Sequence, residues 1–322
     1  MMKSKDIKKV DLHLHLDGSL SLQVIEALVK DHGMDLKGDS LKSQISVGTD
    51  CRSLVDYLRC FELPLRLLQT EDALILATKD LVKRLFQSGL SYCEIRFAPQ
   101  LHTDEGMSQQ QVVEAVLKGV REVHKSGYRL PLGILLCMMV TGEERANRET
   151  AELSAAYLKR GVVGLDLAGA EGAVPMSQFK PLFTLAYQAD VPFTIHTGEC
   201  GSYDNIAEAV AFGARRIGHG CGAIFSESCM NLLEREKIVL EMCPTSNLQT
   251  KAVASIEAHP IRRFFDRGMQ VTVNTDNMTV SDTTLEQEYR LLKEKLRFTD
   301  DELAAMGDMA LRAAFLRDFD IR

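Results

Sequence analysis

Two histidines separated by one residue stand near the start of the chain, within the run KKVDLHLHLDGSL. His13 and His15 alternate with apolar residues, as in a β-strand. Residues i and i+2 of a strand face the same side, so both imidazoles project together, as two ligands of one metal ion must. This spacing alone also leaves open a pair of hydrogen-bonded histidines in a polar pocket.

Eight short apolar runs are spread along the chain, most of them nearly continuous rather than alternating, which is typical of parallel strands covered by helices. They are the run with the two histidines and residues 90–99, 129–140, 162–170, 191–199, 216–220, 238–247 and 270–277. Helical periodicity separates them, with predicted helices ending at Gly127 and Gly161, a helix over Leu285–Leu296 and a closing helix over 301–316.

This order predicts an α/β fold, a (β/α)8 TIM barrel with a helical insertion after the first strand, at about residues 33–80, and extra C-terminal helices. No Pro/Ser-rich linker, repeat or low-complexity segment interrupts the pattern. We therefore expect residues 1–322 to form a single domain.

Polar residues with reactive side chains follow several of these runs, where the carboxyl ends of barrel strands form active sites. They are Asp17, Asp166, His196, Glu199, His219, Asp276 and Asn277, and Gly169 ends the same run as Asp166. With the first pair, four of the eight histidines would gather at one rim beside carboxylates, which indicates a metal centre. The other histidines lie in helix or loop contexts, and we expect them at the solvated surface: His32, His102, His124 and His259.

The bulk composition limits the possible partners. The 322 residues are 45% hydrophobic, enough for a large core, and the net charge of −7 argues against a nucleic-acid or anionic-membrane surface. Eight scattered cysteines without a CxxC pair indicate a reducing compartment. The N-terminal stretch MMKSKDIKKV has no apolar signal-peptide core, so we expect a cytoplasmic protein.

The motifs HLHLDGS, DLAGAE, HTGE, RIGHG, CPTSN and NTDN occur in this order between residues 11 and 277. Together they resemble the adenosine deaminase family, the metal-dependent purine nucleoside aminohydrolases of the amidohydrolase superfamily. The resemblance implies one Zn²⁺ per chain, held by His13, His15, His196 and Asp276, with one position left for water. It also implies the reaction, a hydrolytic deamination of adenosine and 2′-deoxyadenosine to inosine and 2′-deoxyinosine plus ammonia, in purine salvage.

Three residues match catalytic positions of the family. Glu199 matches the proton donor to the purine, a role for which a partly desolvated pocket should raise its pKa. His219 matches the residue that orients or deprotonates the metal-bound water. Asp276 is expected both to bind zinc and to accept a hydrogen bond from that water.

Substrate contacts also carry over from the resemblance. The Gly169 N–H resembles the donor to a purine ring nitrogen, and Asp17, beside His15, corresponds to the residue near the ribose hydroxyls. In SLVDYLRCF, Leu58 and Phe61 resemble the apolar cover of the family's lid. A tight turn at the glycine and ordinary helix packing in the lid are the alternatives.

One position departs from the commonest family pattern, which has two aspartates followed by proline where this chain has Asp276-Asn277-Met278. The second aspartate meets the imidazole nitrogen of the purine. An asparagine amide can donate or accept a hydrogen bond there without a titrating proton. We expect Asn277 to preserve purine recognition with a shifted pH dependence or base preference.

The sequence also bears on four alternatives to an adenosine deaminase. The first is the same deamination on another aminopurine, namely adenine, N6-methyl-AMP or a modified nucleoside. A phosphorylated substrate would need a cluster of basic residues, for which Arg52 and Arg59 are the candidates. A non-purine metallohydrolase such as an amidase is less favoured, because LDLAGAE lacks the bridging lysine of binuclear members. A catalytically inactive binding protein is disfavoured by the complete ligand and acid set. The HxE and PCxxC signature of cytidine-type deaminases is absent. A small purine nucleoside is thus the expected partner, with the oligomeric state undetermined.

Overall fold

The computed structural model describes residues 7–48 and 51–316. Its strands form two parallel four-stranded sheets, one of β1 to β4 and one of β5 to β8, each in sequence order. The strands are β1 (Val10–His15), β2 (Tyr92–Phe97), β3 (Leu132–Met139), β4 (Val162–Ala168), β5 (Thr194–Thr197), β6 (Arg216–His219), β7 (Val239–Met242) and β8 (Gln270–Val273).

Isolated bridges connect the two sheets on both sides. Leu165 pairs with Phe193 between β4 and β5, and Leu14 pairs with Asp276 between β1 and the segment after β8. Two backbone hydrogen bonds of 2.8 Å reinforce the second connection, from His15 N to Asp276 O and from Asp276 N to His13 O. The strands therefore form a (β/α)8 barrel, and Asp276 lies beside the first histidine pair.

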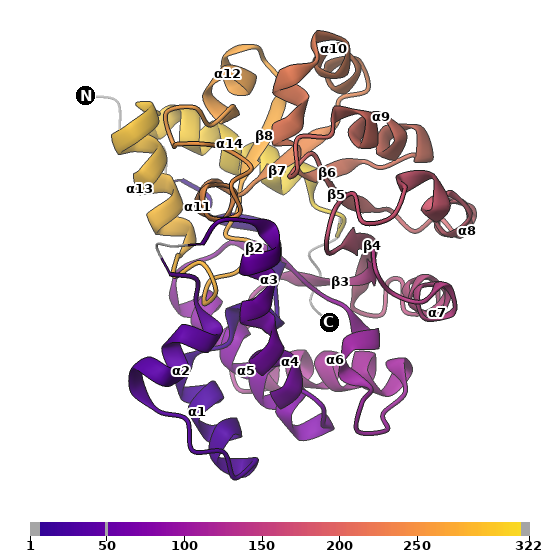
Figure 1. Ribbon diagram of the computed structural model, residues 1–322, viewed down its shortest axis with the longest axis vertical. Helices are drawn as coiled ribbons and strands as arrows, with labels where there is room; N and C mark the ends of the chain where they lie inside the picture. Colours follow the sequence, from indigo (N-terminus) through magenta and orange to yellow (C-terminus); the bar gives the residue numbers. More distant parts are fainter. Residues whose placement is uncertain (1–6, 49–50, 317–322) are drawn as a thin grey trace.

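Helices surround the strands, and α1 to α5 together fill the connection between β1 and β2 (Figure 1), where the sequence predicts a helical insertion. The helices are α1 (Leu22–Asp31), α2 (Gly38–Ile45), α3 (Leu54–Leu58), α4 (Glu62–Leu67), α5 (Glu71–Gln87), α6 (Gln109–Lys125), α7 (Glu144–Ala156), α8 (Lys180–Gln188), α9 (Tyr203–Phe212), α10 (Glu227–Arg235), α11 (Pro244–Gln249), α12 (Ile261–Asp266), α13 (Leu285–Leu296) and α14 (Asp300–Ala313).

Most predicted elements are confirmed, but several predicted boundaries are wrong; for example, the strand predicted over 270–277 ends at Val273. The helix predicted to end at Gly161 ends at Ala156, because the chain then turns through Lys159, whose φ is 63°. The strand predicted over 238–247 ends at Met242, because Pro244 opens α11 at a position where a missing N–H costs nothing. The CPTSN motif is thereby placed on a helix start above the barrel.

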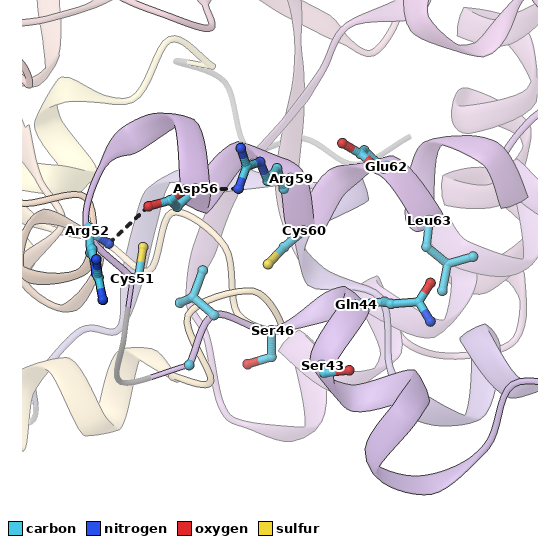
Figure 2. A pocket seen from close by; sticks show the side chains of 12 residues that line it. Ser43, Gln44, Ser46, Cys51, Arg52, Asp56, Arg59, Cys60, Glu62 and Leu63 are labelled. Atoms are coloured by element: carbon cyan, nitrogen blue, oxygen red, sulfur yellow. Dashed lines mark hydrogen bonds and ion pairs between the residues drawn. The ribbon is translucent and has the colours of Figure 1, made fainter.

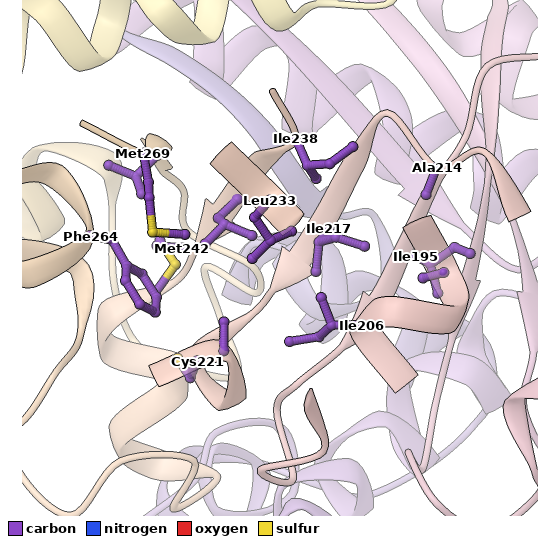
Figure 3. Close-up of a cluster of buried hydrophobic side chains, with 14 of the residues drawn as sticks. Ile195, Ile206, Ala214, Ile217, Cys221, Leu233, Ile238, Met242, Phe264 and Met269 are labelled. Carbon is purple, nitrogen blue, oxygen red and sulfur yellow. The ribbon is translucent and has the colours of Figure 1, made fainter. Parts of the chain in front are cut away.

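Buried aliphatic side chains fill the layer between β5 to β8 and the helices that cover them (Figure 3). Ile195 and Ile217 from the strands lie in one cluster with Leu233 of α10 and Phe264 of α12. Cys221 belongs to the same cluster, as a small apolar side chain. This packing fixes the strand ends from which the polar residues project.

Two predictions reach beyond the described residues, since residues 1–6 of the N-terminal stretch and residues 317–322 lie outside them. The expectation that residues 1–322 form one domain stays a prediction. Within the described ranges, no helix combines the length and the apolar character needed to cross a membrane.

Candidate active site at the carboxyl ends of the strands

A pocket of about 220 Å³ opens where the strands end, between the barrel and the α3–α4 segment. It gathers most of the predicted site residues, from β1, β5, β6 and the segment after β8. Its lining comprises His15, Asp17, Leu54, Tyr57, Leu58, Phe61, Leu65, Ala98, Leu101, Cys137, Met139, Thr141, Ala168, Gly169, Ala170, His196, Glu199, His219, Asp276 and Asn277.

Four side chains converge beside this pocket as metal ligands would. Asp276 Oδ1 lies 3.5 Å from His13 Nε2 and 3.4 Å from His15 Nε2, and His15 Nε2 lies 3.2 Å from His196 Nε2. Ligand atoms of a tetrahedral zinc site, with bonds of about 2.0–2.1 Å, are about 3.4 Å apart. His13 Nε2 is also buried without a hydrogen-bond partner among the described residues, so the donor set fits one metal ion.

His219 adds an ambiguity to the ligand set. His13, His196, His219 and Asp276 each offer a ligand atom, and these atoms all lie within 4.8 Å of one another. This group differs from the predicted set by having His219 in place of His15. Proximity alone therefore leaves two alternative quartets with three members in common.

Buried carboxylates orient two of the imidazoles. His13 Nδ1 donates to Glu241 Oε2 at 2.9 Å, and His196 Nδ1 donates to Asp166 Oδ1 at 3.2 Å. Because an ionised carboxylate only accepts, both Nε2 atoms are left without hydrogen and free to bind a metal.

The carboxylates are in turn neutralised inside the barrel. Arg96 pairs with Asp166 at 2.7 Å and with Glu241 at 2.8 Å, and Arg216 pairs with Glu241 at 2.6 Å. Burial tends to raise the pKa of Asp166, but the charge of Arg96 and the hydrogen bond from His196 outweigh it and hold that pKa below its usual value. Arg96 and Glu241 were not predicted from the sequence, where a charge within an otherwise apolar strand run is the only indication of their role.

Glu199 is a buried carboxyl group directly after β5. Burial, together with the charge of Asp276, raises the pKa of Glu199 to about 8. The carboxyl group therefore carries its proton near neutral pH, as the predicted role of acid requires. Its Oε2 lies 3.7 Å from His219 Nε2, at the floor of the pocket.

Glu171 holds the segment that carries Glu199, a function that the sequence analysis missed although DLAGAE ends in this residue. Its Oε1 accepts hydrogen bonds from Thr197 Oγ1 at 2.7 Å and from Gly198 N at 2.8 Å. It also accepts from Cys200 N at 2.8 Å through Oε2 and from Asn205 Nδ2 at 3.1 Å. One carboxylate thus binds the backbone on both sides of the acid.

Two residues of the site have left-handed backbone conformations, His219 with φ of 64° and Asp276 with φ of 60°. Such strain in non-glycine residues clusters at functional sites. Asp276 is fixed further by Ser246 Oγ, which donates to its Oδ2 at 2.6 Å. Gly169, with φ of 108°, occupies a conformation that favours glycine and lines the pocket, and its role as a donor to the purine stays a prediction.

Asn277 connects the barrel to α3 of the lid. Its Nδ2 donates to Tyr57 Oη at 3.0 Å, and Tyr57 Oη lies 2.6 Å from Ser281 Oγ. Leu58 and Phe61 line the pocket with Tyr57, and their role as an apolar cover stays a prediction. The lid is therefore held by a polar contact of Tyr57 that was not predicted from the sequence, where Leu58 and Phe61 were the lid residues singled out.

A second, wider cavity of about 540 Å³ lies between α2 and the α3–α4 segment (Figure 2). Arg52 and Arg59 line this cavity and not the histidine pocket, and Asp56 receives hydrogen bonds from both. Its lining lacks histidine, so the smaller pocket is the candidate active site.

The prediction that the remaining histidines lie at the solvated surface is wrong for two of them. His102 and His259 are buried, because each finds a hydrogen-bond partner in the interior. His102 Nδ1 donates to Leu68 O at 3.0 Å, and His259 Nε2 lies 3.2 Å from Asn247 Oδ1. His32 and His124 are half-buried.

The family model described as "Adenosine deaminase" matches residues 8–321. The chain belongs to the adenosine deaminase family. An adenosine deaminase from Haemophilus ducreyi is 47% identical over 318 residues, which are 97% of this chain and 92% of that protein. The family is thus established over nearly the whole chain, and the resemblance found in the motifs is confirmed.

Two solved structures show the same fold. The Arabidopsis N6-mAMP deaminase superposes with a TM-score of 0.87 at 27% identity, over 99% of this chain and 96% of that one. The adenine deaminase from Arthrobacter aurescens gives a TM-score of 0.86 at 24% identity, over 97% of this chain and 95% of that one. The same barrel is therefore found in deaminases with different named substrates.

Proposed function

We propose that this chain hydrolyses adenosine and 2′-deoxyadenosine to the inosine nucleosides and ammonia, as an enzyme of purine salvage with one zinc ion per chain. The observation that carries the proposal is the convergence of three imidazoles and Asp276 beside the buried, protonated Glu199. The 47% identity to a relative named adenosine deaminase supports the substrate.

His13, His15, His196 and Asp276 would hold the metal, since neutral imidazoles and a carboxylate are ligands that zinc prefers. A divalent ion bound there lowers the pKa of water and so supplies hydroxide near neutral pH.

The side chains of the pocket perform the remaining steps. Glu199 gives its proton to the purine ring nitrogen next to C6, which makes that carbon electrophilic as the oxygen of water bonds to it. Asp276 accepts a hydrogen bond from the attacking water and His219 lies beside it, so both orient the oxygen. One proton of the water passes through Asp276 to the amino nitrogen, the C6–N bond breaks, and the amine leaves as ammonia. The other proton of the water restores the acid form of Glu199, and the oxygen stays as the carbonyl of inosine.

The lining favours a neutral nucleoside over a nucleotide. Around the histidine pocket, the described lining contains no Lys or Arg, and most of its residues are apolar. Arg52 and Arg59, the candidate phosphate ligands, line the other cavity. Asp17 lines this pocket, where it would bind the ribose hydroxyls, and its carboxylate would repel a phosphate group. The similarity to the N6-mAMP deaminase keeps that nucleotide as the second candidate.

Eight free thiols, seven of them buried, support a reducing compartment, and we place the activity in the cytoplasm.

A substrate panel tests the proposal. Metal-loaded protein is incubated with adenosine, 2′-deoxyadenosine, adenine, AMP and N6-methyl-AMP, and deamination is followed by purine absorbance, with metal content measured in parallel. We expect adenosine to give the highest kcat/KM and a metal content near one per chain. Failure to turn over any aminopurine nucleoside would refute the function, and about two metal ions per chain would refute the mononuclear site.

A further inference from the structure

His219 has a protein partner on the side of its ring that faces away from the pocket. The side chain is buried, and its Nδ1 lies 3.0 Å from Asn247 Nδ2 of α11. Its Nε2 faces the pocket, 3.7 Å from Glu199 Oε2. The proton position on this ring therefore depends on which atom of the Asn247 amide meets Nδ1.

The orientation of the Asn247 amide is fixed by the main chain. Its Oδ1 accepts a hydrogen bond from the backbone N–H of Cys243 at 3.3 Å, and Cys221 Sγ lies 3.4 Å from the same oxygen. If the amide were turned over, its NH₂ group would face that backbone N–H, donor against donor. The atom at His219 Nδ1 is therefore an N–H donor.

His259 fixes the same amide from a second side. The backbone N–H of Ile261 donates to His259 Nδ1 at 3.2 Å, so the hydrogen of this neutral imidazole is on Nε2. Burial lowers the pKa of His259 to about 3, which keeps the ring neutral. Its Nε2–H then donates to Asn247 Oδ1 at 3.2 Å. The series of hydrogen bonds from Ile261 to His219 thus has one consistent direction.

We propose that Asn247 and His259 are positioning residues that keep Nδ1 of His219 free of hydrogen, so that His219 presents an Nε2–H donor to the pocket. A doubly protonated imidazole is excluded by the same contact, because its Nδ1–H would face the Asn247 N–H.

Two consequences follow for the site. His219 has no nitrogen left for a metal, since Nδ1 accepts from Asn247 and Nε2 carries hydrogen. Of the two alternative quartets, the one with His15 remains. In the reaction, His219 donates a hydrogen bond to the attacking oxygen and does not take its proton, so Asp276 is the acceptor. Only this second consequence rests on the proposed function.

The proton position is measured directly by long-range ¹H–¹⁵N correlation spectra of protein labelled with ¹⁵N-histidine. We expect His219 and His259 both to be neutral with hydrogen on Nε2, in the protein with and without zinc. Hydrogen on Nδ1 of His219 overturns the proposal, and hydrogen on Nδ1 of His259 removes its part in it. This measurement needs neither a variant nor turnover, so it is independent of the proposed function.

Asn247→Asp is the variant that tests the cause. A carboxylate only accepts, so we expect a hydrogen to appear on Nδ1 of His219. An unchanged spectrum would show that Asn247 does not set the proton position. Asn231→Asp makes the same substitution on the exposed surface of α10 and should leave the His219 signals unchanged.

Metal affinity tests the ligand set without turnover. His15→Gln should weaken zinc binding by more than about 100-fold in competition with a chelator. His219→Gln should weaken it by less than about 100-fold, since substitutions outside the ligand set cost about 10- to 100-fold. The reverse order of the two variants would place His219 among the ligands and overturn the proposal.

Discussion

The clamp that Glu171 places on the Glu199 segment gives a prediction for kcat. Its two carboxylate oxygens accept four hydrogen bonds, three of them from residues that flank the acid: Thr197, Gly198 and Cys200. In a Glu171→Gln variant, one oxygen is kept for Thr197 and Gly198. The other becomes an NH₂ group that faces the backbone N–H of Cys200, donor against donor.

The magnitude follows from the lost contact. A hydrogen bond to a charged group contributes about 1.5–3 kcal/mol, and Glu171→Gln loses at least the one from Cys200. If that energy is lost in the placement of Glu199 at the transition state, kcat falls by about 10- to 100-fold, since each 1.36 kcal/mol is tenfold. Initial rates with adenosine over a range of concentrations measure kcat and KM separately.

The comparison with Glu199→Gln shows whether the effect of Glu171 passes through the acid. We expect the double variant to be no slower than Glu199→Gln alone, because residues that act as a unit are not additive. Glu286→Gln, the same change at an exposed position, should leave kcat within about twofold. A folded Glu171→Gln protein with wild-type kcat would refute the clamp.

Glu199→Gln itself should abolish turnover while metal binding persists. In the wild type, kcat should decline at alkaline pH, by about pH 8 at the latest, because the Glu199 carboxyl acts in its protonated form and a bound cation only lowers its pKa. Loss of bound metal, or a rate that still rises above pH 9, would contradict its role as acid. Tyr57→Phe should raise KM about 5- to 10-fold with kcat little changed, because about 1–1.5 kcal/mol of contact to Asn277 and Ser281 is lost from the lid; an unchanged KM would mean that the contact does not hold the lid. Arg96→Met should lower the free energy of unfolding by about 3–5 kcal/mol, about 4–7 °C in Tm for this chain length, by leaving Asp166 and Glu241 less compensated; a Tm within about 1 °C of wild type would refute it.

The barrel and the reactive side chains were predictable because both depend on short-range patterns. Near-continuous apolar runs separated by helical periodicity indicate parallel strands, and the strand ends of a barrel meet at one face whatever the details of packing. His13 and Asp276 are 263 positions apart in numbering, yet the topology alone brings their strand ends together.

The residues that hold the reactive groups were not predictable in the same way. Arg96 and Glu241 lie in the middle of strands, where burial is normally apolar, and their partners come from other strands. His259 was assigned to the surface because a loop histidine usually lies there, and its burial depends on an amide 12 residues away. Such contacts depend on side-chain orientation, which periodicity does not determine.

The supporting residues act in the same way, because the group that each presents to a reactive imidazole either only accepts or only donates a hydrogen bond. Glu241 can only accept from His13, which frees Nε2 for a metal, whereas Asn247 donates to His219, which fills Nε2 with hydrogen. The two imidazoles lie with ring centroids 4.8 Å apart in the same buried site, so burial and proximity do not distinguish them. What assigns one to the metal and the other to the attacking oxygen is the partner on the far side of each ring. The identity of these partners, a carboxylate in β7 and an amide in α11, therefore carries as much of the chemistry as the histidines themselves.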